Sequence, residues 1–222
     1  MELILSSGAP AFAHLIDGAP RSLVVVPDIW GLRELYAQMV EDLAALTGWS
    51  VVAIEPFPGQ SLGGADDSDG FDQRSAALRT IDDARLLGDA AAAADATGCA
   101  HAGLIGFCMG GMYALKAAAI DRFDAVVGCY GMIRVPDAWS GPGQGQPLDA
   151  VARRGETAVM AIVGTVDAWT PPADVDALEA AGATVVRYEG ADHGFLHDPS
   201  RPAHRPDDAA DAWTRALGFL DR

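Results

Sequence analysis

The ten residues 102–111, Ala-Gly-Leu-Ile-Gly-Phe-Cys-Met-Gly-Gly, decide the fold of this chain. Residues 102–107 are apolar at almost every position, as in a strand that is buried on both faces. The glycines at 106 and 110 bracket Cys108 in the pattern G-x-C-x-G, which is typical of a sharp turn from a strand into a helix. Such a turn exposes its central residue at the carboxyl edge of an α/β sheet, and the start of the following helix favours a thiolate there. The alternative interpretation is a buried cysteine beside a glycine-rich helix start.

Similar apolar runs recur on both sides of this segment. They lie at residues 22–27, 50–54, 124–129, 157–163 and 184–188. Strands that are apolar on both faces belong to a parallel sheet with helices on both sides. Helical patterns alternate with these runs, at residues 32–46, 73–97 with a break near Gly88, 110–121, 170–182 and from 207 onward. The alternation predicts a doubly wound α/β sheet with right-handed crossovers.

The remaining segments complete this predicted architecture. Short strands at residues 2–5 and 11–16 form an antiparallel N-terminal edge. Two long loops are expected at residues 56–72 and 133–155, the second as an irregular surface loop because its glycines precede no helix directly. No internal repeat or linker divides the chain, so we predict one domain over residues 1–222.

The composition excludes several classes of function. Fifteen basic and 31 acidic residues give a formal net charge of −16, which opposes binding to nucleic acid or to an anionic membrane. Three cysteines without a CxxC pair indicate neither a disulfide framework nor a zinc site, and they favour a cytoplasmic location. Residues 1–5 lack the basic start of a signal peptide. Residues 96–115 carry no Asp, Glu, Lys or Arg, but their five glycines and His101 argue against a membrane span.

Two further polar residues follow predicted strands in an informative order. Asp167 lies in Gly164-Thr165-Val166-Asp167, just after one strand, and His193 follows the next strand in Gly190-Ala191-Asp192-His193. Nucleophile, acid and base in this order, each after a strand, are typical of enzymes that use a Cys-His-Asp or Ser-His-Asp triad. The alternatives are a turn or capping role for Asp167 and an ordinary loop histidine at 193.

The constellation resembles the dienelactone hydrolase family of α/β-hydrolases over residues 22–220. Its motifs stand here as Gly106 to Gly111, as Gly164 to Asp167 followed by Pro171, as Asp192-His193-Gly194-Phe195, as Tyr130-Gly131, and as Pro27-Asp28-Ile29-Trp30-Gly31-Leu32. The resemblance implies an α/β-hydrolase fold and hydrolysis of a small ester or lactone. It implies no cofactor and no metal.

The resemblance also implies a role for each matching residue. Cys108 attacks the ester carbonyl to give an acyl-thioester intermediate, His193 activates it and later assists the attack of water, and Asp167 orients the histidine. The backbone N–H groups of Ile29 and Met109 form the oxyanion hole. Supporting residues are Asp28 and Tyr130, and candidate substrate-binding residues are Trp30, Arg74, Phe195 and His197.

Asp28 and His197 depart from the family pattern. The family carries a glutamate at the position of Asp28, where it contacts the resting cysteine, and Asp28 is one methylene shorter. A second interpretation makes Asp28 the N-cap of the helix that starts near Leu32. Enzymes that act on dienelactone hold its carboxylate with arginines, one of them four residues after the histidine, where this chain has His197. We therefore expect a small ester or lactone, rather than dienelactone, as the substrate.

Other classes of function remain open at this point. A binding protein could keep this fold with a silent site, and a metal-dependent hydrolase could use His193, His197 and Asp198. The glycine spacing of 106–111 lacks the Lys-Ser/Thr of a phosphate-binding loop, and the acidic loop around Asp67 lacks the anchoring carboxylates of a calcium loop. We expect a monomer or a small homo-oligomer.

Overall fold

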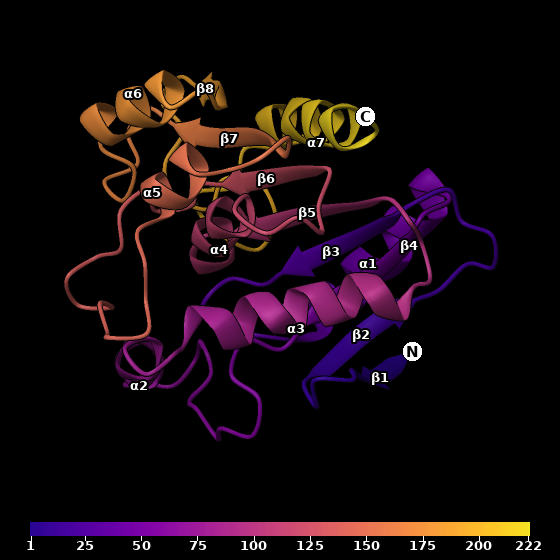
Figure 1. Cartoon of the computed structure of the whole chain (residues 1–222). Coiled ribbons are helices and arrows are strands. Elements are labelled where there is room, and N and C mark those ends of the chain that lie inside the picture. Colours follow the sequence, from indigo (N-terminus) through magenta and orange to yellow (C-terminus); the bar gives the residue numbers. More distant parts are fainter.

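The structure of the chain, a computed structural model, describes residues 1–222 and is built on one eight-stranded sheet (Figure 1). The strands are β1 Glu2–Ile4, β2 Pro10–His14, β3 Ser22–Val26, β4 Ser50–Ile54, β5 Ala102–Phe107, β6 Ala125–Cys129, β7 Ala158–Gly164 and β8 Thr184–Tyr188. Their order across the sheet is β1-β2-β4-β3-β5-β6-β7-β8. Strands β3 to β8 pair in parallel, whereas β1 and β2 form an antiparallel edge next to β4. The predicted fold class is therefore confirmed.

Seven helices accompany this sheet. They are α1 Glu34–Thr47, α2 Gly70–Leu78, α3 Asp83–Ala96, α4 Met109–Ala117, α5 Pro147–Ala152, α6 Pro172–Ala180 and α7 Pro206–Leu220. Of these, α1, α3, α4, α6 and α7 contact its strands. On one face, the ring of Phe107 lies 6.3 Å from that of Tyr36 on α1 and 5.7 Å from that of Trp213 on α7. Helices α3 and α4 contact each other on the opposite face, where α4 also packs on β5 and β6.

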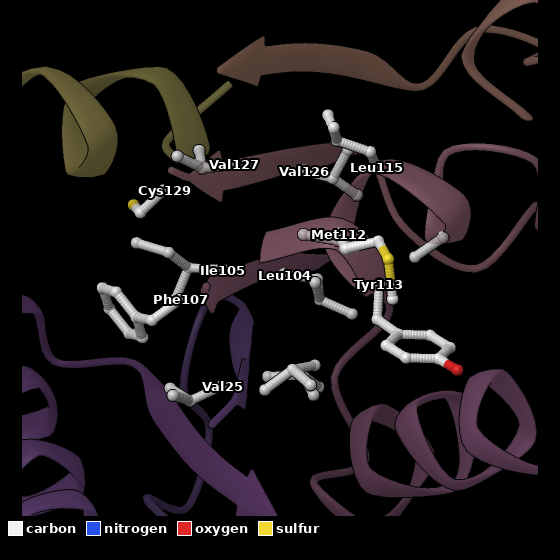
Figure 2. Close-up of a cluster of buried hydrophobic side chains, with 14 of the residues drawn as sticks. Val25, Leu104, Ile105, Phe107, Met112, Tyr113, Leu115, Val126, Val127 and Cys129 are labelled. Carbon is white, nitrogen blue, oxygen red and sulfur yellow. The ribbon is translucent and has the colours of Figure 1, made fainter. Parts of the chain in front are cut away.

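Side chains alternate between the two faces, as expected for strands in a buried sheet. Figure 2 shows Ile105, Phe107, Val127 and Cys129 on one side of β5 and β6, and Leu104, Met112, Tyr113, Leu115 and Val126 on the other. Every residue of β3, β4, β5 and β6 is buried. This burial on both faces explains why the sequences of the central strands are continuous apolar runs.

Two sequence expectations about the helices are wrong. The helical pattern at 73–97 is broken at residues 79–82 and not near Gly88, because the side chain of Asp82 accepts the N–H of Ala84 and starts a new helix there. Gly88 lies within the uninterrupted α3. The loop at 133–155 is also more regular than expected, because it contains α5, which begins at Pro147.

The order of the strands places a topological switch point at the centre of the sheet. From β3 the chain crosses to β4 on one side and then returns to β5 on the other side of β3. The connections that follow β3 and β5 therefore lead to opposite sides of the sheet. Open α/β sheets bind their ligands at such a point.

No helix of the chain combines the length and apolar character that a membrane crossing requires.

Candidate active site

Cys108 occupies a strained turn between β5 and α4. Its φ of 56° and ψ of −117° lie outside the regions that residues other than glycine ordinarily adopt. The turn closes only because its flanks lack side chains: a Cβ at Gly106 would lie 2.0 Å from the carbonyl oxygen of Gly110, and one at Gly110 would lie 2.1 Å from that of Val26. Cys108 keeps 8% of its surface exposed. The predicted sharp turn at this position is thus present in the structure, and strain of this kind concentrates at functional sites.

Asp167 and His193 come together at the same edge of the sheet. Asp167 follows β7 and is 4% exposed, and His193 lies in the loop after β8. The Oδ2 atom of Asp167 and the Nδ1 atom of His193 are 2.9 Å apart. Burial alone lowers the pKa of His193, but the charge of Cys108 and the hydrogen bonds to Asp167 and Cys108 raise it to about 10. The structure therefore joins His193 to Asp167 by a hydrogen bond, and Cys108 contributes to the pKa of His193.

Two backbone N–H groups next to this group have no acceptor. Neither the N–H of Ile29 nor that of Met109 takes part in a hydrogen bond within the chain. Met109 is the first residue of α4, whose opening N–H groups cannot bond within the helix. Ile29 lies in the loop after β3, and its carbonyl oxygen accepts a hydrogen bond from Arg74. Both donors thus lack a partner within the chain and follow the carboxyl ends of β3 and β5.

Asp28 is the centre of a buried network of charges. It is 1% exposed, and its carboxylate forms a bidentate pair with the guanidinium of Arg33 at 2.7 and 2.9 Å. The same carboxylate contacts Nε2 of His197 at 2.9 Å and accepts the N–H of Trp30. Burial raises the pKa of Asp28, but the hydrogen bonds and charges of His197 and Arg33 outweigh it and hold this pKa well below its usual range.

This network corrects one interpretation of Asp28. Helix α1 begins at Glu34, its N-cap residue is Arg33, and no side chain caps it, so Asp28 is not a helix cap. The hydrogen bonds of the Asp28 carboxylate also include none to Cys108. Sequence reasoning missed Arg33 altogether, because nothing in its spacing marks it as the partner of a buried carboxylate.

The side chain of His197 is buried within the protein, although His197 is one of the residues that line a groove between α1 and α7. Its side chain is fully buried, and its two ring nitrogens bond to Asp28 and to the hydroxyl of Tyr130. Its ring stacks on Phe107 with centroids 4.7 Å apart, and burial lowers its pKa. Both ring nitrogens of His197 are thus engaged within the protein, and a role of His197 in substrate binding stays a prediction. Tyr130 is, with Cys108, one of two non-glycine residues with a positive φ. The centroid of its ring lies 5.1 Å from that of the His193 ring, so this network reaches the candidate catalytic group.

Two other candidate substrate-binding residues also have structural roles. The guanidinium of Arg74 donates to the carbonyl oxygens of Gly63, Leu62 and Ile29 and thereby holds the loop that carries Ile29. Phe195 is fully buried and packs against aromatic side chains of the core. Among the residues expected to contact substrate, Trp30 is an aromatic residue that packs against the core and remains partly exposed.

The geometry separates the residues of the alternative metal site. His193 is bonded to Asp167, whereas both ring nitrogens of His197 are taken by Tyr130 and Asp28. The chain holds no group of three or more His, Cys, Asp or Glu side chains arranged to bind a metal ion. His193 and His197 thus act in different contacts despite their suggestive spacing.

One apolar groove on the surface is lined in part by His197. It has a volume of about 430 Å³ and runs between α1 and α7, with Leu35, Met39, Leu43 and Trp213 among its lining residues. The candidate catalytic residues Cys108, Asp167 and His193 follow β5, β7 and β8 and do not line this groove.

The fold and the site define an α/β-hydrolase. A model of the "Dienelactone hydrolase family" matches residues 11–222. The chain belongs to that family, as predicted. Membership confirms the predicted class of enzyme, a hydrolase of esters or lactones.

Individual relatives agree with this assignment. The chain is 28% identical over 236 residues to the "Probable 2-oxo-3-(5-oxofuran-2-ylidene)propanoate lactonase" of a Bradyrhizobium species. The alignment covers 97% of this chain and 90% of the relative. The chain is also 28% identical over 225 residues to the "Carboxymethylenebutenolidase" of Rhodococcus opacus, covering 92% and 82% of the two chains. Among solved structures, the "Putative Dienelactone Hydrolase" of Klebsiella pneumoniae superposes with a TM-score of 0.84 at 26% identity, over 100% of this chain and 98% of that one.

Proposed function

We propose that this protein hydrolyses a small ester or lactone through Cys108, His193 and Asp167. The observation that carries the proposal is the strained turn that presents Cys108 beside a histidine whose other nitrogen is bonded to a buried carboxylate. A cysteine nucleophile needs an adjacent base, and the base needs a group that orients it. The named activities of the relatives, a lactonase and a carboxymethylenebutenolidase, support a lactone or ester as the substrate.

The electrostatics of the site favour a protonated His193. Its pKa is raised to about 10, which keeps the ring protonated at neutral pH. In the proposed mechanism the sulfur of Cys108 attacks as a thiolate while the His193 ring holds the proton. Asp167 then stabilises the imidazolium through the hydrogen bond to Nδ1.

In the proposed reaction, every proton and every electron pair that moves has a donor and an acceptor. The Sγ atom of Cys108 adds to the carbonyl carbon, and the N–H groups of Ile29 and Met109 stabilise the resulting oxyanion. The carbon–oxygen bond of the ester breaks, and His193 gives its proton to the departing alkoxide. A water molecule then attacks the acyl-thioester, His193 accepts its proton, and the carbon–sulfur bond breaks to release the acid and restore the thiolate–imidazolium pair.

Turnover of p-nitrophenyl acetate tests this proposal. Cys108→Ala should abolish turnover, and His193→Ala should lower kcat by about 10²–10⁴-fold, as expected for the loss of a general base. Asp167→Asn should lower it by no more than His193→Ala. The matched control is Cys99→Ala, which removes a partly exposed thiol outside the site and should leave kcat unchanged.

Labelling with iodoacetamide gives an independent measurement. Peptide mapping should show Cys108 as the dominant alkylated residue, because Cys129 is buried and burial raises the pKa of its thiol. Wild-type turnover by Cys108→Ala, or dominant labelling at Cys99 or Cys129, would refute the assignment of the nucleophile.

A further inference from the structure

Large apolar side chains gather on the elements that border the candidate active site. Seven large hydrophobic residues of the chain are exposed, and three of them, Phe71, Val166 and Trp169, lie on such elements. Val166 and Trp169 flank Asp167 at 59% and 40% exposure. Exposed apolar groups that cluster at one place commonly mark a binding surface.

Trp169 is held rigidly beside the candidate general base. The carboxylate of Asp167 uses Oδ2 for His193 and Oδ1 to accept the N–H of Trp169 at 2.8 Å. The indole stacks on Trp139, with ring centroids 5.4 Å apart and an interplanar angle of 20°. Its centroid lies 6.3 Å from that of the His193 ring. One face of Trp169 is thus supported from behind while part of the ring remains open to solvent next to His193.

The support behind Trp169 continues into helix α2. Trp139 is 2% exposed, and its indole N–H donates to the hydroxyl of Ser75 at 3.2 Å. Phe71 lies one turn before Ser75 on the same helix, and its ring is 6.3 Å from that of Trp30. Trp30 directly follows Ile29, the candidate oxyanion donor. Aromatic side chains therefore stand on both sides of the site, and α2 connects them.

Two of the cations near the site, Arg74 and Arg33, are already engaged within the protein. Arg74 donates to three backbone carbonyls, and Arg33 pairs with the buried Asp28. The guanidinium of Arg201 lies next to Gly194, the residue after His193. Arg201 is therefore the cation near His193 that could contact a substrate carboxylate, and the experiment below includes it. The net charge of −16 opposes the approach of an anionic substrate.

On this basis we propose that the site selects esters whose leaving alcohol carries an uncharged aromatic ring, and that this ring stacks on the exposed part of Trp169. The proposal rests on the function proposed above, because His193 protonates the leaving oxygen and the surface beside His193 therefore meets the alcohol part of the substrate. An uncharged ring gains contact with the indole, whereas an added carboxylate gains no such contact and is opposed by the net charge of the chain.

Three acetate esters test this selectivity. Ethyl acetate, benzyl acetate and 4-(acetoxymethyl)benzoate form the same acetyl-enzyme, so differences in kcat/KM among them report on the leaving alcohol, and release of acetic acid is followed by pH-stat titration. Benzyl acetate should exceed ethyl acetate by up to about tenfold, the gain that one aromatic contact provides. The carboxylated analogue should be slower than benzyl acetate.

Variants connect the selectivity with the indole. Trp169→Ala should bring the ratio of benzyl to ethyl acetate close to one, and Trp169→Phe, which keeps a ring, should retain part of it. The matched control is Leu46→Ala, which removes an exposed apolar side chain on α1 and should leave the ratio unchanged. Circular dichroism establishes that each variant is folded, and Trp169→Phe tests the proposal even where Trp169→Ala does not fold.

The outcomes distinguish a failure of the proposed selectivity from a failure of the proposed function. Hydrolysis of ethyl acetate without any gain from the ring, or a gain that survives in Trp169→Ala, would overturn this proposal alone. A preference for the carboxylated ester that disappears in Arg201→Ala would also overturn it and would assign an anion site to Arg201. Wild-type protein that hydrolyses none of the three esters would overturn the proposed function as well.

Discussion

Replacing Asp28 by alanine should lower the free energy of unfolding by about 3–5 kcal/mol, because it leaves a buried charged network without its central carboxylate. The magnitude follows from the contacts: two hydrogen bonds from Arg33, one contact with His197 and one from the N–H of Trp30 all meet a side chain that is 1% exposed. A residue that only capped a helix would contribute ~0.5–2 kcal/mol. For a chain of 222 residues, the predicted loss corresponds to a melting temperature lower by roughly 6–20 °C.

Urea unfolding followed by circular dichroism measures this loss. Asp28→Asn, which keeps the shape and removes the charge, separates the electrostatic part from the packing part. Arg33→Met and the double variant with Asp28→Ala complete a double-mutant cycle, in which the pair should show a coupling energy of about 1–3 kcal/mol. A loss below about 1 kcal/mol for Asp28→Ala, or additive effects of the two substitutions, would contradict the proposed role of the buried pair.

The remaining predictions concern pH, backbone packing and metal dependence. The folded protein holds the pKa of His197 below its usual value, so on acidification the unfolded chain binds a proton before the folded one does. The free energy of unfolding should therefore fall as the pH drops below about 6.5. His197→Gln should flatten this dependence in unfolding measurements between about pH 5 and 7. Gly110→Ala should prevent stable folding, because its Cβ would lie 2.1 Å from the carbonyl oxygen of Val26. Gly88→Ala is the matched control, because a Cβ there meets nothing within 4 Å inside α3. It should raise the free energy of unfolding, measured with urea, by about 0.5–1 kcal/mol. Incubation with EDTA should leave ester hydrolysis unchanged, and a loss of activity that zinc restores would support the metal-dependent alternative instead.

The parts of the site that follow from the sequence are those fixed by position after a strand. Cys108, Asp167 and His193 each come shortly after an apolar run, and parallel strands carry the residues that follow them to one edge of the sheet. Local pattern and topology were therefore enough to predict that these three residues lie near one another. The glycines around Cys108 could be interpreted in the same way, because their spacing reflects a backbone approach that excludes a side chain.

The parts that the sequence does not reveal depend on pairing between side chains far apart in the chain. Asp28 and His197 are 169 residues apart, and nothing in either local pattern indicates that they share a hydrogen bond. The role of Arg74 is hidden for the same reason, since its partners are backbone carbonyls that carry no sequence signal. The helix break at 79–82 was missed because Asp82 starts the new helix as a cap, without a glycine or proline to mark it.

The buried network has a further consequence for the geometry of the site. Asp28 lies on the loop after β3, Tyr130 on the loop after β6, and His197 on the loop after β8. These loops also carry or adjoin Ile29 and His193, so one chain of hydrogen bonds fixes the distance between the candidate oxyanion donor and the candidate base. Catalytic groups tolerate little displacement, because a shift of about 1 Å in a reacting group can cost 10²-fold in rate. Loss of the network should therefore reduce kcat in variants that remain folded, even though none of its hydrogen bonds reaches Cys108.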